Sequence, residues 1–188
     1  MRVLMVSSEA HPFAKTGGLA DVLGALPQAL VRLGHEVDVM VPRYRGIAAT
    51  EAVADGVRYL FVNHPEYFDR DYLYGAGGHD YADNAERFAF FARAAVAHAH
   101  ATGYDIVHAH DWQAGLVPLL LGASPSPVPA QQTFPAAPVP RTVFTIHNLA
   151  YQGVFDASWL PRLGLPWTLF NVNALEFWGR ITYLKAGL

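Results

Sequence analysis

Apolar positions along the chain fall into short continuous runs and longer spaced stripes. Residues 2–7 form a nearly unbroken apolar run, RVLMVS, which is typical of a strand buried on both faces. Across 19–33 the leucines and valines recur mostly every three or four residues, so this segment is predicted to be a helix with one apolar face. Pro27 predicts a kink in that helix, Gly34 is a natural stop, and 37–41 read as the next strand.

The alternation of strand and helix patterns continues to the end of the chain. Further strands are predicted at 57–62, 105–110 and 141–146, and further helices at 84–102 (with Asn84 as its N-cap), 113–121 and the end of the chain. Residues 123–140 carry six prolines and no charged residue, which predicts a surface loop.

Strands that alternate with helices predict the α/β class. We expect a Rossmann-like, mostly parallel open sheet with helices on both faces. In such sheets ligands bind beyond the carboxyl ends of the strands. The candidate site should therefore involve the segments 7–18, 110–112 and 147–153.

Composition narrows the class of protein further. Hydrophobic residues make up 52% of the chain and charged residues 15%, which is ample for a buried core. A formal net charge of −3 gives no reason to expect nucleic acid or an anionic membrane as partner. The absence of cysteine removes disulfides, thiolate nucleophiles and cysteine zinc sites, and suits a reducing cytoplasm. We expect a cytoplasmic protein.

A glycine pair opens the first predicted helix. Gly17 and Gly18 let a bulky ligand approach the backbone, and their N–H groups with the helix dipole suit a phosphate. Lys15 adds a positive charge beside them. The dinucleotide fingerprint and the P-loop are both missing from the sequence, which disfavours a dehydrogenase or a P-loop ATPase. A plain turn with a solvated Lys15 explains the glycine pair equally well.

Histidines mark the ends of two predicted strands. His108 and His110 share one face of their strand, so a metal site must be considered. The simpler interpretation is that both are strand-end histidines bonded to the backbone. His147 lies where a strand becomes a loop, which is the position of a crevice residue, although a single histidine is more often structural.

Five strings carry a resemblance to a known family. They are KTGGLADVLGALPQAL, DYADNAERFAFF, VHAHDWQAGLVP, FTIHNLAYQGVF and LEFWGRITYLKAGL, in this order. Together they resemble bacterial glycogen synthases and plant starch synthases over nearly the whole of 2–188. The resemblance implies a GT-B glycosyltransferase, in which two Rossmann-like domains face a cleft. The chain 1–188 would be an incomplete amino-terminal catalytic domain, with the carboxyl-terminal nucleotide-binding domain absent.

The resemblance also implies an activity and a set of roles. Such enzymes transfer glucose from ADP-glucose to the non-reducing end of an α-1,4-glucan or maltooligosaccharide, with retention and with no metal or other cofactor. Asp111 and His147 would be catalytic and would orient the glucose. The substrate-binding residues would be Lys15, Gly17 and Gly18 at the diphosphate, Asp21 at the nucleoside, Tyr81 and Trp112 at the sugar, and Asn148 and Gln152 around it.

In this family the carboxyl-terminal domain carries most of the nucleotide pocket, so the isolated chain is expected to be inactive. One alternative is a non-catalytic module that binds α-glucan or nucleotide. Another is a UDP-using glycosyltransferase of similar architecture. The segment 46–57 is shorter than is usual in the family, and we expect it to lack a hairpin.

Overall fold

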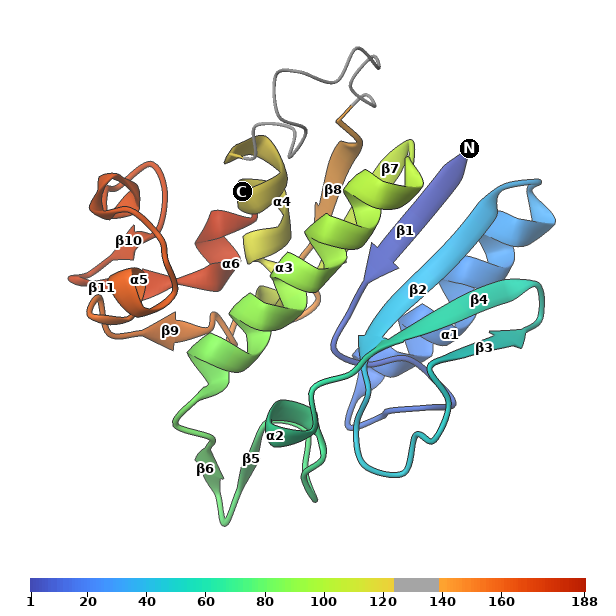
Figure 1. The fold of residues 1–188 in the computed structure, drawn as a ribbon, viewed down its shortest axis with the longest axis horizontal. Helices are drawn as coiled ribbons and strands as arrows, with labels where there is room; N and C mark the ends of the chain where they lie inside the picture. Colours follow the sequence, from blue (N-terminus) through green and yellow to red (C-terminus); the bar gives the residue numbers. More distant parts are fainter. Residues whose placement is uncertain (124–138) are drawn as a thin grey trace.

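A six-stranded sheet forms the centre of the computed structural model, which describes residues 1–123 and 139–188 (Figure 1). The predicted proline-rich loop, 123–140, falls almost entirely outside the described residues. In spatial order the strands are β3 (Glu51–Ala54), β4 (Val57–Val62), β2 (Glu36–Pro42), β1 (Arg2–Val6), β7 (Ile106–His110) and β8 (Arg141–Thr145).

Every pairing in this sheet is parallel except that of β3 with β4. The predicted mostly parallel open sheet is therefore confirmed. The expectation that 46–57 lacks a hairpin is wrong, because β3 and β4 form one. Asp55 and Gly56, with φ of 51° and 78°, make the two-residue turn between them. An Asp-Gly pair is a strong hairpin signal because both turn residues need positive φ.

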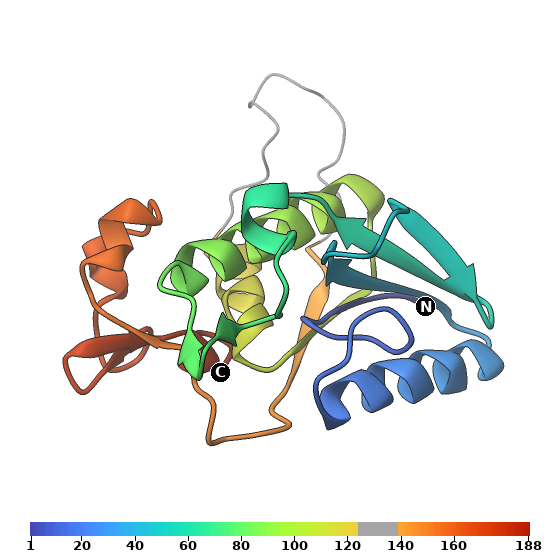
Figure 2. The same ribbon diagram turned by 90° about the horizontal axis from the view of Figure 1, so that it is seen from below.

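Helices cover both faces of the sheet, as predicted. Figure 2 shows α1 (Gly18–Arg32) on one side, and α3 (Asn84–Thr102) and α4 (Leu116–Ala123) on the other. The N-cap of α3 is Asp83, not Asn84. Asn84 occupies the first helical position instead, since its side chain donates to the carbonyl of Tyr74 at 2.8 Å and accepts from Arg87 at 2.6 Å.

Smaller elements surround the sheet. They are α2 (Pro65–Phe68), β5 (Gly75–Ala76), β6 (His79–Asp80), β9 (Val154–Phe155), α5 (Trp159–Arg162), β10 (Glu176–Phe177), β11 (Arg180–Thr182), α6 (Tyr183–Ala186) and the 3-10 turns Trp112–Ala114 and Trp167–Leu169. β9, β10 and β11 form a small antiparallel sheet that was not predicted, and α6 lies at the end of the chain, where a helix was expected.

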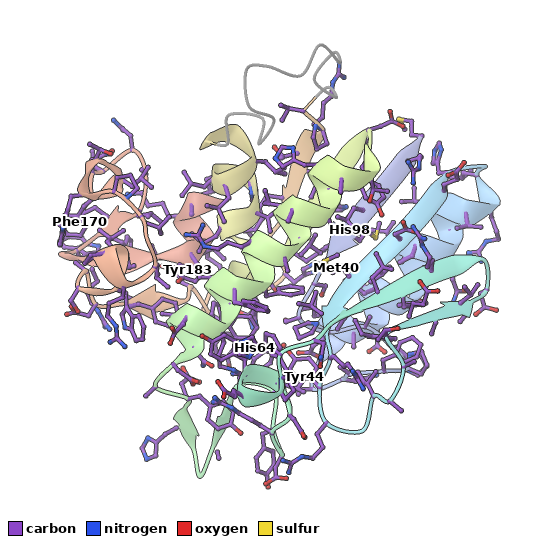
Figure 3. The ribbon with its side chains drawn as sticks, in the orientation of Figure 1. Met40, Tyr44, His64, His98, Phe170 and Tyr183 are labelled. Carbon is purple, nitrogen blue, oxygen red and sulfur yellow. The ribbon has the colours of Figure 1, made fainter. Side chains whose placement is uncertain are left out.

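Tyr183 joins this carboxyl-terminal region to the rest of the core (Figure 3). It is fully buried, and its hydroxyl donates to the carbonyl of Ala85 in α3 at 2.7 Å. Gly115 permits the contact, since a Cβ there would lie 2.0 Å from the Tyr183 carbonyl. Among the described helices, none is both long and apolar enough to cross a membrane.

Candidate functional site at the carboxyl edge of the sheet

The strand order reverses between β1 and β7. The chain runs from β1 to β2 on one side, and β7 then packs on the other side of β1. Val6 pairs with Ala109, and His110 pairs with Thr145, so these strands end at the same edge. The three segments expected to hold the site therefore start side by side at a topological switch point, where open α/β sheets bind ligands.

Asp111 leaves β7 in a strained conformation. Its φ of 56° and ψ of −179° lie in a region that only glycine adopts freely, which costs about 1–3 kcal/mol. Two contacts hold it there: its N–H donates to the carbonyl of Thr145 at 2.9 Å, and its Oδ1 accepts from the His147 N–H at 2.7 Å. The N–H of Asn148 lies 3.4 Å from the same oxygen. Strain of this kind concentrates at functional sites.

The second oxygen of this carboxylate, Oδ2, has no protein partner in residues 1–123 and 139–188. Asp111 thus uses one oxygen to position the loop after β8, and its other oxygen can accept a further hydrogen bond. An ionised carboxylate accepts bonds only, so the group suited to this oxygen is a hydroxyl or another donor.

His108, His110 and His147 form a stack beside Asp111. Ring centroids are 4.0 Å apart for the first pair and 5.2 Å for the second. His110 Nδ1 lies 2.9 Å from His147 Nε2, and His108 Nε2 lies 2.7 Å from the hydroxyl of Thr145. The interpretation of His108 and His110 as histidines bonded to the backbone is therefore wrong, because side chains are their partners.

This stack is uncharged at its buried end. Burial, with the neighbouring imidazoles, lowers the pKa of His110 to about 2, and burial also lowers the pKa of His108. In the part of the chain that the structure describes, no group of three or more His, Cys, Asp or Glu side chains is placed to hold a metal ion.

A second buried carboxylate, Glu9, shapes the glycine loop. It is 3% exposed and accepts from the Thr16 N–H at 2.6 Å, the Thr16 hydroxyl at 2.6 Å, the Gly17 N–H at 3.2 Å and the Tyr74 hydroxyl at 2.7 Å. A buried carboxylate needs such donors. The expectation that the Gly17 N–H is free for a ligand is therefore wrong, because this N–H donates to Glu9. The only signal of this role in the sequence is that Glu9 lies three residues beyond the last residue of a buried strand.

Gly18 keeps the features expected of an anion site. It begins α1, and its N–H has no hydrogen-bond partner within the described residues. A Cβ at Gly17 or Gly18 would meet no atom within 4 Å, so open space lies over this helix end.

Lys15 and Asp21 form an ion pair beside that open space. Lys15 Nζ lies 2.5 Å from Asp21 Oδ1, and the two side chains are 49% and 60% exposed. An exposed pair contributes little stability, so an incoming anion can take Lys15 from Asp21 at small cost.

Tyr81 and Trp112 lie in packed surroundings. The ring of Tyr81 contacts the guanidinium groups of Arg70 and Arg87, with centroid distances of 4.7 Å and 5.0 Å. Trp112 is 8% exposed and packs edge-on against Phe88 at 5.0 Å. Trp112 is therefore almost fully covered by the protein, whereas Tyr81 is partly exposed and has two guanidinium groups against its ring.

Asn148 and Gln152 shape the loop after β8. The Asn148 side chain accepts from the N–H of Ala150 at 3.0 Å. The carbonyl of Gln152 accepts from the Thr182 hydroxyl at 2.6 Å, while its side chain donates to Leu149 at 3.3 Å. The bond from Thr182 ties the loop to β11, and both side chains bond to backbone groups within the loop itself.

A recess of about 420 Å³ adjoins the glycine loop. It lies between Lys15, Thr16 and the segment 71–75. A second recess of about 310 Å³ is lined by Tyr72 and 75–80. Tyr72 borders both recesses and is 62% exposed. Sequence analysis did not single out this residue.

The strain at Asp111 predicts an unusual order of stabilities. Asp111→Gly and Asp111→Ala both remove the carboxylate, but only glycine relaxes at φ 56°. We expect the glycine variant to be the more stable by about 1 kcal/mol, after strain of about 1–3 kcal/mol is set against the entropy cost of glycine, about 0.5–1 kcal/mol. Urea unfolding measures the difference. A more stable alanine variant would show that the position is unstrained.

The neutral His110 predicts stability that is lost in acid. The unfolded chain takes up a proton at this residue near pH 6.5, whereas the folded protein does so only near its lowered pKa of about 2. Stability is therefore complete above pH 6.5 and falls below it. Between pH 7.5 and 5.5 this residue alone should cost about 1.4 kcal/mol of unfolding free energy. Urea unfolding of His110→Asn over the same pH range should show a fall in unfolding free energy that is smaller by about this amount than that of the unmodified protein. An equal fall in the two proteins would contradict the assignment.

Comparisons with known proteins show which family the chain belongs to. A family profile described as "Starch synthase catalytic domain" matches residues 2–188. The chain is 44% identical to a glycogen synthase of Koribacter versatilis over 213 residues and 46% identical to one of Anaeromyxobacter sp. (strain K) over 211 residues. Each match covers the whole chain and 43% of the relative, so the chain spans less than half the length of these proteins.

A solved structure shares the fold. The catalytic domain of starch synthase IV from Arabidopsis thaliana, bound to ADP and acarbose, matches 98% of this chain and 42% of its own, with a TM-score of 0.80 and 29% identity. The α/β sheet described above is thus that of the amino-terminal part of a GT-B catalytic domain. With the family profile matched from residue 2 to the last residue, the chain belongs to the starch synthase catalytic domain family.

Proposed function

We propose that this chain is the amino-terminal part of an ADP-glucose-dependent glycogen or starch synthase. The reaction is transfer of glucose to the non-reducing end of an α-1,4-glucan with retention. The observation that carries the proposal is the meeting of Asp111, His147 and the open amino end of α1 at one edge of the sheet. The related plant enzyme is bound to ADP and acarbose, a nucleotide and an oligosaccharide analogue, which supports this substrate class.

The charges at the site suit the departure of a diphosphate. During the transfer, negative charge grows on the leaving group, and preorganised donors stabilise it. The Gly18 N–H and the α1 dipole supply part of this stabilisation, and Lys15 supplies a full positive charge once it leaves Asp21. Gly17 contributes by having no side chain in the way.

Asp111 and His147 are assigned to the glucose. The unpaired Oδ2 of Asp111 accepts from a sugar hydroxyl, and the exposed ring of His147 makes the second polar contact. Asn148 and Gln152 keep the loop in place around the sugar. Holding reactants in the correct geometry can supply several kcal/mol of the barrier reduction.

Tyr72 is assigned to the acceptor glucan in place of Tyr81. The other aromatic rings between residues 67 and 81 are engaged: Tyr67 stacks on His64, Phe68 is fully buried, Tyr74 bonds to Glu9, and Tyr81 contacts two arginines. Tyr72 alone of these is largely exposed, beside the recess that Lys15 also lines. The C–H faces of glucose rings pack well on such an aromatic plane.

The proposal assigns no metal ion or other cofactor to the reaction, since Lys15 and the helix dipole provide the positive potential. It also places the protein in the cytoplasm, which a chain without cysteine suits.

Replacement of Lys15 tests the diphosphate assignment. In the full-length protein that contains this segment, Lys15→Ala should lower kcat for transfer from ADP-glucose by about 10²–10³-fold, because one preorganised positive group is lost. Lys15→Arg, the matched control, should keep more of the activity. The 188-residue chain by itself should show no transferase activity. An active enzyme indifferent to Lys15→Ala would contradict the role, and tight binding of maltooligosaccharide or ADP-glucose without turnover would favour a non-catalytic module.

Replacement of Tyr72 tests the acceptor assignment. Tyr72→Ala should raise KM for a maltooligosaccharide about two- to twelvefold, on the basis of about 0.5–1.5 kcal/mol for an aromatic packing contact. KM for ADP-glucose should stay the same, and Tyr72→Trp should restore acceptor binding. Equal acceptor KM in Tyr72→Ala and the unmodified enzyme would remove Tyr72 from the site.

A further inference from the structure

His110 is buried next to a predicted catalytic residue, and its side chain makes a single polar contact with the residues that the structure describes. Its Nδ1 lies 2.9 Å from Nε2 of His147. Its other nitrogen, Nε2, is buried and has no hydrogen-bond partner among the described residues. His108 stacks on the ring at 4.0 Å and is itself held by the hydroxyl of Thr145. The ring of His110 is thus held in one plane. The nitrogen that carries its proton decides whether His147 accepts or donates the hydrogen bond between the two rings.

A neutral imidazole carries one N–H, so two arrangements are possible. If the proton of His110 were on Nε2, a buried donor would have no acceptor. If the proton is on Nδ1, it is donated to His147, and only a lone pair stays unpaired. Orphaned buried N–H groups are very rare in proteins. The second arrangement is therefore the favoured one. Because burial keeps His110 neutral, this arrangement persists over the working pH range.

We propose that His110 is a positioning residue that donates its Nδ1–H to Nε2 of His147 and so fixes His147 with its own proton on Nδ1. His147 then presents an N–H donor at the crevice, and its only basic lone pair is occupied. The next step rests on the proposed function: this N–H donor binds an oxygen of the glucose, and His147 does not act as a general base.

The tautomer can be observed directly. Long-range ¹H–¹⁵N NMR on full-length protein with labelled histidine distinguishes the two nitrogens of each ring, and loss of one set of signals in His147→Asn assigns that set. We expect His147 to carry its proton on Nδ1. A proton on Nε2, or an averaged mixture of the two tautomers, would overturn the proposal whatever the activity of the protein.

A matched pair of variants tests the consequence. The amide nitrogen of His110→Asn lies near the position of Nδ1 and can still donate to His147, whereas His110→Gln places its amide near Nε2. We expect the asparagine variant to keep the His147 tautomer and most of kcat. The glutamine variant should lose the tautomer and up to about 10²-fold in kcat, with a smaller change in KM for ADP-glucose. Circular dichroism and urea unfolding check that both variants are folded.

The outcomes separate the two proposals. Equal kcat in both folded variants, with the His147 tautomer unchanged, would show that His110 only packs. If neither variant folds, the tautomer in the unmodified protein still decides. A proton on Nδ1 of His147 in a protein with no transferase activity would uphold the positioning role and refute the proposed function.

Discussion

The bond between the Asp111 carboxylate and the His147 N–H is the contact on which the candidate site depends. It joins the ends of β7 and β8 across 36 residues of sequence and holds Asp111 in a backbone conformation that would otherwise relax. The same contact sets where the ring of His147 stands, and therefore how the three stacked imidazoles meet. Without it, the His110–His147 contact and the bonds of the Gln152 carbonyl would be left to hold the loop after β8.

Glu9 plays a corresponding part after β1. It gathers Thr16, Gly17 and Tyr74 around one buried carboxylate, and so shapes the loop that leads into α1. At both strand ends a carboxylate accepts hydrogen bonds from main-chain N–H groups. Among the described residues, one polar group at each end has no partner: Oδ2 of Asp111 after β7 and the Gly18 N–H after β1. Buried carboxylates with several donors are rigid, which is what a preorganised site needs.

The sequence predicted the sheet and the edge because both follow from local patterns. Buried runs such as 2–7 and the stripe of 19–33 can be recognised without tertiary information, and the position of ligands follows from the parallel topology. β3 was missed although Asp55 and Gly56 are a recognisable turn pair, because the strand before them is only four residues long and two of these are alanines, which have low β propensity.

The use of individual side chains could not be predicted in the same way. Whether the Gly17 N–H is free depends on Glu9, and whether Tyr81 can stack on a sugar depends on Arg70 and Arg87. These are partners from other elements, and only the folded chain brings them together. The exposure of Tyr72 and the pairing of His110 with His147 are likewise tertiary facts.

A crystal structure of the full-length protein with ADP-glucose would test the central claim most directly. The account predicts the diphosphate within about 3 Å of the Gly18 N–H, Lys15 turned from Asp21 toward it, and a glucose hydroxyl on Oδ2 of Asp111. A donor sugar bound away from this edge, with Lys15 still paired to Asp21, would contradict it.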